Sequence, residues 1–189
     1  MKRAGDTDMG AIYAVADGMS GNEIKRIRGK LGLTQLAFSE LVNASKKTIE
    51  RWETSEKVIR GPSVTLLKLL DENPEIEESL RIPERDYPMR LWYLWKNDIC
   101  AVVDVDERYR KVKVYNYTND LLKRPFGRET HPTFEQYGEF LESRCFPRSR
   151  DKMKLMLREL DLPFYDPLMI IEKTNGRMAE DDFHIEIER

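Results

Sequence analysis

The chain has 189 residues, of which 40% are hydrophobic and 35% are charged, and its formal net charge is −2. This length allows one or two domains with hydrophobic cores, and the high charged fraction favours a soluble, cytoplasmic protein. No apolar run approaches the roughly 20 residues of a membrane span, and the N-terminus lacks the apolar segment of a secretory signal, so we expect no membrane association. Cys100 and Cys145 fit no metal or redox motif, so we expect reduced thiols and neither metal nor cofactor.

Residues 1–20 contain three glycines and a short apolar patch over 12–16. This composition leaves two alternatives open, a flexible lead or a short extra helix. A helix is predicted over 22–31, because Ile24, Ile27 and Leu31 recur with helical spacing. Gly32 then stands where a helix commonly ends in the left-handed conformation.

A tight turn separates the next two predicted helices. Thr34 and Ser45 are the expected N-caps, since a hydroxyl there accepts a hydrogen bond from an exposed backbone N–H. Asn43 lies at the turn and tolerates the left-handed conformation. The positions expected to face inward are Leu36, Phe38, Leu41 and Val42 in the first of these helices, and Ile49 and Trp52 in the second. The outward positions of the second are then Lys46, Lys47, Thr48, Glu50 and Arg51.

A fourth helix is predicted from Pro62, whose missing N–H costs nothing at a helix start. Its inward positions are expected to be Val64, Leu66, Leu67 and Leu70. Residues 21–62 hold nine Lys or Arg against five Glu, inside a chain whose net charge is negative. This concentration is typical of a nucleic-acid-binding surface. A small helical bundle with a solvated basic face, or a protein-binding helix-turn-helix, is the alternative.

These elements resemble the Cro/C1-type (XRE-like) helix-turn-helix domain of phage repressors and bacterial regulators. The resemblance covers 21–73 and rests on the Gly-Leu-Thr-Gln entry to the second helix, the Ser/Thr start of the third, its Trp-Glu end and the Gly-Pro before the fourth. The Gly-Pro and the run over 66–75 are similar to a subset found in antitoxins. Ser39 and Asn43 depart from the Ala and Gly common in the family, which affects the tightness of the turn.

The resemblance implies a site as well as a fold. Gln35 would contact a phosphate or a base edge, and Arg28 would form an ion pair with Glu53 between the first and third helices. The residues expected to bind double-stranded DNA are Thr34, Gln35, Ser45, Lys46, Lys47, Thr48, Arg51, Lys57 and Arg60. Lys and Arg donate well to guanine and phosphate, and the start of the third helix adds exposed N–H groups.

The charge changes sign after this domain. Residues 71–86 contain seven acidic residues but only two arginines, and prolines recur in and just after this stretch. Residues 74–89 are therefore predicted to be an acidic linker. Strands are predicted over 90–95, 99–105 and 111–115, forming an antiparallel meander with a hairpin turn at Asn97-Asp98. Trp92 and Trp95, three apart on a strand, would lie on opposite faces of the sheet.

Three helices and a fourth strand complete the predicted second domain, 90–189. Thr133 and Gln136 form a capping-box pattern, Ser149 is the expected cap of the second helix, and Asp166-Pro167 begins the third. The last strand is indicated by the alternation of Phe183, Ile185 and Ile187. The predicted fold class is α+β: an all-α helix-turn-helix domain followed by a small α+β domain.

Two charged clusters in this half have alternative interpretations. A basic cluster could contact flanking DNA or an acidic partner, or form an ordinary exposed face: Arg144, Arg148, Arg150, Lys152 and Lys154. An acidic cluster is more simply a solvated surface than a cation site: Glu180, Asp181, Asp182, Glu186 and Glu188. The segments 144–150 and 176–183 resemble accessory regions of HipA-like kinase proteins, without the Gly-rich loop or catalytic residues of a kinase core.

The sequence therefore predicts a sequence-specific DNA-binding transcription regulator. A repressor is expected, because repression is the commoner mode of action in the resembled family. Two-fold symmetry of a homodimer would place its half-sites about one helical turn apart. The alternative is an antitoxin whose residues 90–189 bind a partner protein. Residues 90–189 show no nucleophile–base or metal-ligand spacing, so we expect no enzyme.

Overall fold

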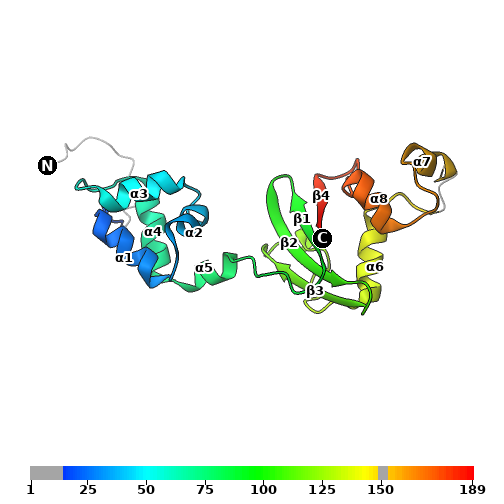
Figure 1. The fold of residues 1–189 in the computed structure, drawn as a ribbon, viewed down its shortest axis with the longest axis horizontal. Coiled ribbons are helices and arrows are strands. Elements are labelled where there is room, and N and C mark those ends of the chain that lie inside the picture. The colour runs from blue at the N-terminus through cyan, green and yellow to red at the C-terminus, as the bar shows by residue number, and fades with distance from the viewer. Residues whose placement is uncertain (1–14, 149–152) are drawn as a thin grey trace, which may run out of the picture. The chain divides into compact units, whose positions relative to one another are not determined.

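The computed structural model describes residues 15–148 and 153–189, which divide into two compact units within Met1–Arg81 and Ile82–Arg189 (Figure 1). The predicted α+β class is confirmed, because an all-helical segment precedes an antiparallel sheet with helices of its own. Some predicted features lie outside the described residues. They are residues 1–14 of the lead over 1–20, the expected cap Ser149, and the basic residues Arg150 and Lys152.

The first unit is built of short helices: α1 (Gly21–Lys30), α2 (Gln35–Leu41), α3 (Lys46–Thr54), α4 (Pro62–Glu72) and α5 (Glu75–Leu80). A side-chain hydroxyl caps each of the first three. Ser20 forms a capping box with Glu23, while Thr34 and Ser45 accept from backbone N–H groups as predicted. These caps start the helices at defined residues and so fix the length of the turns between them.

The two turns that bend the chain use left-handed residues. Gly32 has φ +68° after α1, and Asn43 has φ +51° between α2 and α3. Both positions agree with the sequence prediction. Since Asn adopts this conformation at a lower cost than most residues with a Cβ, the turn forms without the glycine common in the resembled family.

Seven buried residues form the core of the first unit: Met19, Ile24, Ile27, Phe38, Ile49, Val64 and Leu67. Two residues predicted to face inward do not, since Leu36 is 55% and Leu66 39% exposed. The predicted apolar stripes were too wide: in α2 the buried residues are Phe38 and Ser39, and in α4 they are Val64, Leu67 and Leu70. Ser39 is buried too, and its hydroxyl donates to the Leu36 carbonyl at 2.7 Å, so no polar group is left unpaired.

The second unit contains a four-stranded antiparallel sheet of order β3-β2-β1-β4. Its strands are β1 (Met89–Trp95), β2 (Asp98–Asp106), β3 (Lys111–Asn116) and β4 (Phe183–Glu188). The predicted meander and the predicted last strand are both present. The first hairpin turn is displaced by one residue from the prediction: Asp98 already pairs with Trp95, so the turn consists of Lys96 and Asn97, with Lys96 at φ +56°.

Helices α6 (Phe134–Ser143) and α8 (Pro167–Thr174) lie against one face of this sheet, and α7 (Met153–Glu159) lies farther from it (Figure 1). The short helix η1 (Leu121–Lys123) precedes them in the chain. The core between the layers joins strand residues such as Leu91 and Val103 to Tyr137 and Ile171 of the helices. Trp95 packs against this core, whereas Trp92 donates its indole N–H to Glu188 at 3.1 Å. The expectation of opposite faces therefore holds.

The segment over 82–88 is attached, through a buried ion pair, to the face of the sheet opposite the helices. Arg90 Nε lies 2.6 Å from an oxygen of Asp104, and Arg90 also donates to the Pro83 carbonyl at 2.9 Å. The backbone N–H of Asp86 donates to Asp104 at 2.8 Å, and the Asp86 carboxylate accepts from Lys113 and Tyr115. The stretch predicted as a linker thus contains a helix, α5, followed by a segment bound to the sheet. The segment is bound because Arg90, Asp104 and Lys113 of the sheet supply charged partners for its polar groups.

Candidate nucleic-acid interface

The core of the first unit orients α3. Ile49 is fully buried and Trp52 packs against the same core, so the remaining faces of the helix point away from it. Lys46, Lys47 and Arg51 are exposed, as the sequence predicts. Thr48 is only half-exposed, because its hydroxyl lies 2.9 Å from that of Ser45 at the cap.

A shallow open groove runs along the exposed face of α3, lined by Ser45, Lys47, Thr48, Glu50, Arg51 and Thr54. Lys46 is partly neutralised, since its ammonium lies 3.6 Å from Glu50 one turn away. In the part of the chain that the structure describes, Lys47 and Arg51 form no ion pair. Two cations one helical turn apart are therefore available to a negatively charged ligand.

A hydrogen-bonded network ties three helices together beneath this face. Arg28 of α1 donates twice to Glu53 of α3, at 2.6 and 3.1 Å, which is the ion pair that the family resemblance implies. Arg28 also donates to the Leu33 carbonyl at 2.9 Å. Burial raises the pKa of Glu53, but the hydrogen bonds from Arg28 and Gln35 outweigh burial, so the net pKa lies below its ordinary value. Glu53 therefore remains a carboxylate that holds the helices in register.

Gln35 belongs to the same network, since its amide N–H donates to Glu53 at 2.9 Å. The contact fixes the orientation of the side chain at the start of α2. An amide group has a second N–H and an oxygen, so Gln35 keeps groups that suit a phosphate or a base edge. Thr34 precedes it with its hydroxyl engaged in the cap, at 3.2 Å from the Ala37 N–H.

Lys57 and Arg60 are exposed in the loop after α3. This loop is held by a short bridge that the sequence did not reveal: Met19 and Ile59 exchange backbone hydrogen bonds of 2.9 and 2.8 Å. A Cβ added to Gly18 would lie 2.3 Å from a Val58 methyl carbon and 2.8 Å from the Ile59 carbonyl oxygen. The glycine at position 18 is the one sequence signal for this close approach.

The predicted basic cluster of the second unit is not a continuous exposed surface. Arg144 is buried and donates to Asp181 at 2.7 Å, as well as to the carbonyls of Gly176 and Phe183. The prediction that it faces outward is wrong, because the segments 144–148 and 176–183 close on each other through this guanidinium. Arg148 pairs with Glu142 at 2.8 Å, and Lys154 is exposed.

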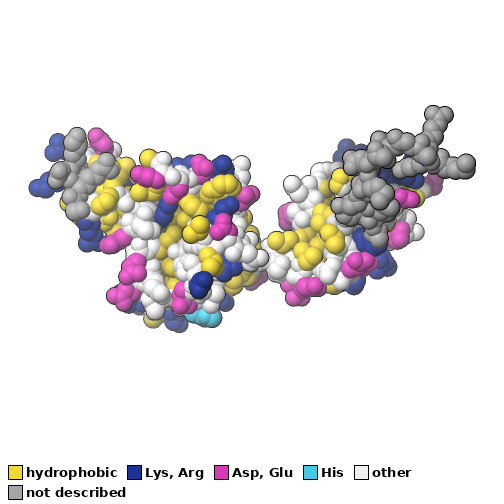
Figure 2. Space-filling view, turned by 180° about the vertical axis from the view of Figure 1, so that it is seen from behind, with side chains coloured by type: hydrophobic (Ala, Val, Ile, Leu, Met, Phe, Trp, Pro, Cys, Tyr) yellow, Lys and Arg dark blue, Asp and Glu magenta, His cyan; other side chains and the backbone are white. Residues whose placement is uncertain are grey.

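The acidic cluster is likewise divided among different partners. Asp181 binds Arg144, and Asp182 lies 3.4 Å from Lys96. Within the described ranges, no group of three or more His, Cys, Asp or Glu side chains could hold a metal ion. On the face drawn in Figure 2, acidic and basic side chains are interspersed, as on a solvated surface.

Both cysteines are buried and unpaired with each other. Burial raises the pKa of the Cys145 thiol to about 12 and that of Cys100 above its ordinary value. Protonated, enclosed thiols are poor nucleophiles and poor metal ligands.

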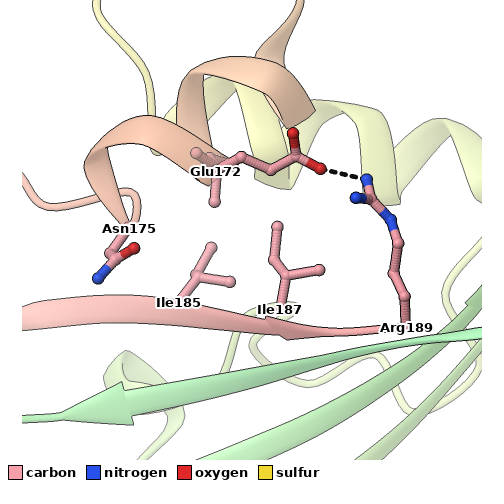
Figure 3. A pocket seen from close by; sticks show the side chains of 6 residues that line it. Glu172, Asn175, Ile185, Ile187 and Arg189 are labelled. Carbon is pink, nitrogen blue, oxygen red and sulfur yellow. Dashed lines mark hydrogen bonds and ion pairs between the residues drawn. The ribbon is translucent and has the colours of Figure 1, made fainter.

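A cavity lies between α8 and β4, lined by Ile171, Glu172, Asn175, Ile185, Ile187 and Arg189 (Figure 3). Ile185 and Ile187 point up from the strand, and Glu172 pairs with Arg189 above them. The polar groups of its lining are thus the Glu172–Arg189 ion pair and the Asn175 amide. Among the described residues, every helix is too short or too polar to cross a membrane.

Comparison with known proteins gives a likeness over part of the chain. No protein-family model matches the chain. The chain is similar to the antitoxin HigA-2 of Vibrio cholerae serotype O1, with 39% identity over 57 residues, which is 30% of this chain and 55% of that protein. The chain thus spans about half the length of the curated relative that it matches.

Proposed function

We propose that this protein is a DNA-binding transcription regulator of the Cro/C1 (XRE-like) type that places α3 in the major groove. The observation that carries the proposal is the pair Lys47 and Arg51, one turn apart on the exposed face of a helix whose other face is buried through Ile49. The major groove admits an α-helix, and Lys and Arg are the side chains that most often read guanine there.

Phosphate contacts would flank this helix. The capped starts of α2 and α3, at Thr34 and Ser45, present backbone N–H groups and positive dipole ends, which bind anions. Gln35, Lys57 and Arg60 add side-chain donors around them. Such contacts fix the register of a protein on the duplex, while the α3 side chains specify sequence. A homodimer acting as a repressor would bind two half-sites about one helical turn apart.

A second candidate function is that of an antitoxin, and the likeness to HigA-2 favours it. In this version the same DNA-binding surface would regulate the operon, and residues 90–189 would bind a partner protein. Both versions describe a binding protein rather than an enzyme.

The test is a selection of genomic DNA fragments by the full-length protein, followed by sequencing. The wild type should enrich an inverted repeat that Lys47→Ala/Arg51→Ala no longer enriches, since each specific contact contributes about 1–3 kcal/mol. Lys25→Ala/Lys68→Ala is the matched control, because it removes two exposed lysines from α1 and α4 of the same unit. Equal enrichment by both variants, or no motif with the wild type, would contradict the proposal.

The antitoxin version makes a separate prediction about the neighbouring gene. A small reading frame beside this gene should inhibit growth when expressed alone and should be harmless when this chain is co-expressed. Persistent inhibition in the presence of the chain would exclude that version and leave the regulator.

A further inference from the structure

We infer that the tip of the β2–β3 hairpin in the second unit is a further DNA-phosphate contact, made by Arg108, Arg110 and Lys111. The inference rests on the proposed DNA-binding function and extends it to a surface outside the helix-turn-helix. The predicted meander implies a connection here, between the strands over 99–105 and 111–115, and no function was predicted for it.

The geometry of the tip is defined. Asp106 pairs with Lys111 as the last residues of the ladder, so four residues over 107–110 form the loop. The Tyr109 N–H donates to the Asp106 carboxylate at 3.0 Å, and Arg110 adopts φ +53°. The hydrogen bond and the left-handed residue define the backbone of the loop, and so the positions from which the basic side chains project.

Each cation at the tip lies beside an aromatic ring. The Arg108 guanidinium carbon is 5.4 Å and the Lys111 ammonium 6.0 Å from the centre of the Tyr109 ring, and Arg110 lies 4.5 Å from that of Phe134. Stacking on a ring leaves the N–H donors of a guanidinium at its edge free. The rings therefore position the cations without consuming their hydrogen bonds.

The three cations lack carboxylate partners in the described part of the chain. All three are exposed, whereas Lys113, two residues further along β3, pairs with Asp86 at 2.9 Å. Glu107 is the one carboxylate in the loop itself, so the tip is net positive. The same holds on α3, where Lys47 and Arg51 form no ion pair with any residue of 15–148 or 153–189.

The composition of the tip fits a phosphate backbone better than a protein surface. Protein interfaces are centred on apolar side chains that become fully buried, but the tip has no aliphatic residue, and its exposed ring, Tyr109, is flanked by charge. Phosphate oxygens need only cations and hydroxyl or N–H donors. Arg108, Tyr109, Arg110 and Lys111 supply these within four consecutive residues.

The test measures how binding depends on salt. Full-length protein is titrated against a labelled DNA duplex several helical turns long, of unselected sequence, at a series of KCl concentrations. The variant is Arg108→Gln/Arg110→Gln/Lys111→Gln. The matched control, Lys154→Gln/Arg158→Gln/Lys173→Gln, removes the same charge from exposed positions on α7 and α8.

The slope of log K against log [KCl] should become shallower by about 2 to 3 in the hairpin variant, because each phosphate contact contributes about 0.9. It should stay at the wild-type value in the control. A hairpin variant with the wild-type slope would overturn the inference while leaving the proposed function intact. If the hairpin variant kept the wild-type slope but no longer co-purified with a protein that the wild type binds, the tip would instead be a contact for an acidic protein partner, and the inference would be overturned. Absence of DNA binding by the wild type would remove both proposals.

Circular dichroism establishes that the variants are folded. Should the triple variant unfold, Arg108→Gln alone serves as the test, since among the described residues this side chain stacks only on its neighbour Tyr109. The slope should then fall by about 0.9, and an unchanged slope would again overturn the inference.

Discussion

At the residue scale, Glu53 shows how one carboxylate organises the helix-turn-helix. Its side chain is only 4% exposed and accepts hydrogen bonds from Arg28 and Gln35. Because the three side chains come from α1, α2 and α3, the network places the start of α2 beside the end of α3. Arg28 and Glu53 thus position Gln35 and α3 from the side that faces the core.

Removal of this charge should destabilise the first unit. Glu53→Gln leaves the Arg28 guanidinium, 18% exposed, without a carboxylate, so we expect a loss of about 2 kcal/mol in the free energy of unfolding. Urea denaturation measures it. Glu56→Gln removes an exposed carboxylate in the loop just after α3, so it is the control and should change stability little. Equal stability of both variants would show that the network contributes nothing.

The same carboxylate predicts a dependence on pH. The pKa of Glu53 in the folded protein lies below its ordinary value of 4.5, so its contribution is complete above that value and is lost as the pH falls through the folded pKa. Unfolding free energies of the wild type should therefore decline more steeply below about pH 4.5 than those of Glu53→Gln. Parallel curves would contradict this assignment.

The turn residue Asn43 is the second informative position. Its φ of +51° suits glycine better than any residue with a Cβ. Asn43→Gly should therefore stabilise the protein, or leave it unchanged, within about 1 kcal/mol. Gly32→Ala, at φ +68° with open space around the added Cβ, should destabilise it by about 1 kcal/mol. Thermal unfolding of these two variants distinguishes backbone strain from the loss of side-chain contacts. Destabilisation by Asn43→Gly would show that the Asn43 amide makes a stabilising contact.

At the element scale, the segment over 82–88 behaves as part of the sheet. Arg90 and Asp104 are 5% and 0% exposed, and their neighbours Pro83 and Asp86 are bonded to them through backbone groups. The ion pair therefore joins the chain entering the second unit to its two central strands. A charged pair in this position favours one register of the strands over alternatives.

Asp104→Asn tests that role, because it leaves the Arg90 charge buried without a counter-charge. We expect a loss of about 3 kcal/mol in the free energy of unfolding. Asp86→Asn should have a smaller effect, since that carboxylate lies at the surface. Hydrogen exchange of the backbone amides over 82–88 supplies the structural measurement, and unchanged protection in Asp104→Asn would contradict the proposed anchoring.

At the scale of the whole molecule, the two units have separate hydrophobic cores. One is built from α1 to α4 and the other from the sheet with α6 to α8. We therefore expect each unit to unfold independently of the other. This organisation matches a protein in which one part binds DNA and another binds a partner.

Two separate unfolding transitions are expected in calorimetry. Glu53→Gln should lower the midpoint of one and Asp104→Asn that of the other, with additive effects in the double variant. The wild type is the common reference for both shifts. A single transition displaced by either substitution would show that the two units unfold together.

The sequence by itself determined the caps and turns of the helix-turn-helix and the order of the elements it predicted, because these depend on neighbouring residues. It gave no sign of the short helices α5 and η1, and it misplaced the first hairpin turn by one residue. Thr34, Ser45, Asn43 and Pro62 were each identified from local chemistry, and the period of apolar residues distinguished the helices from the strands. The exposed cations of α3 also followed from this pattern, since Ile49 and Trp52 mark the face that must be buried.

The tertiary structure decided what depends on contacts between distant residues. Leu36 and Leu66 have the right spacing but find no partner helix, and Arg144 is buried because Asp181, 37 residues away, accepts its hydrogen bonds. The attachment of 82–88 to the sheet and the exposure of the cations at the β2–β3 tip likewise depend on which charges meet in space. Composition and period carry no information on such pairings, because a charged residue has the same local signature whether it is solvated, paired or buried.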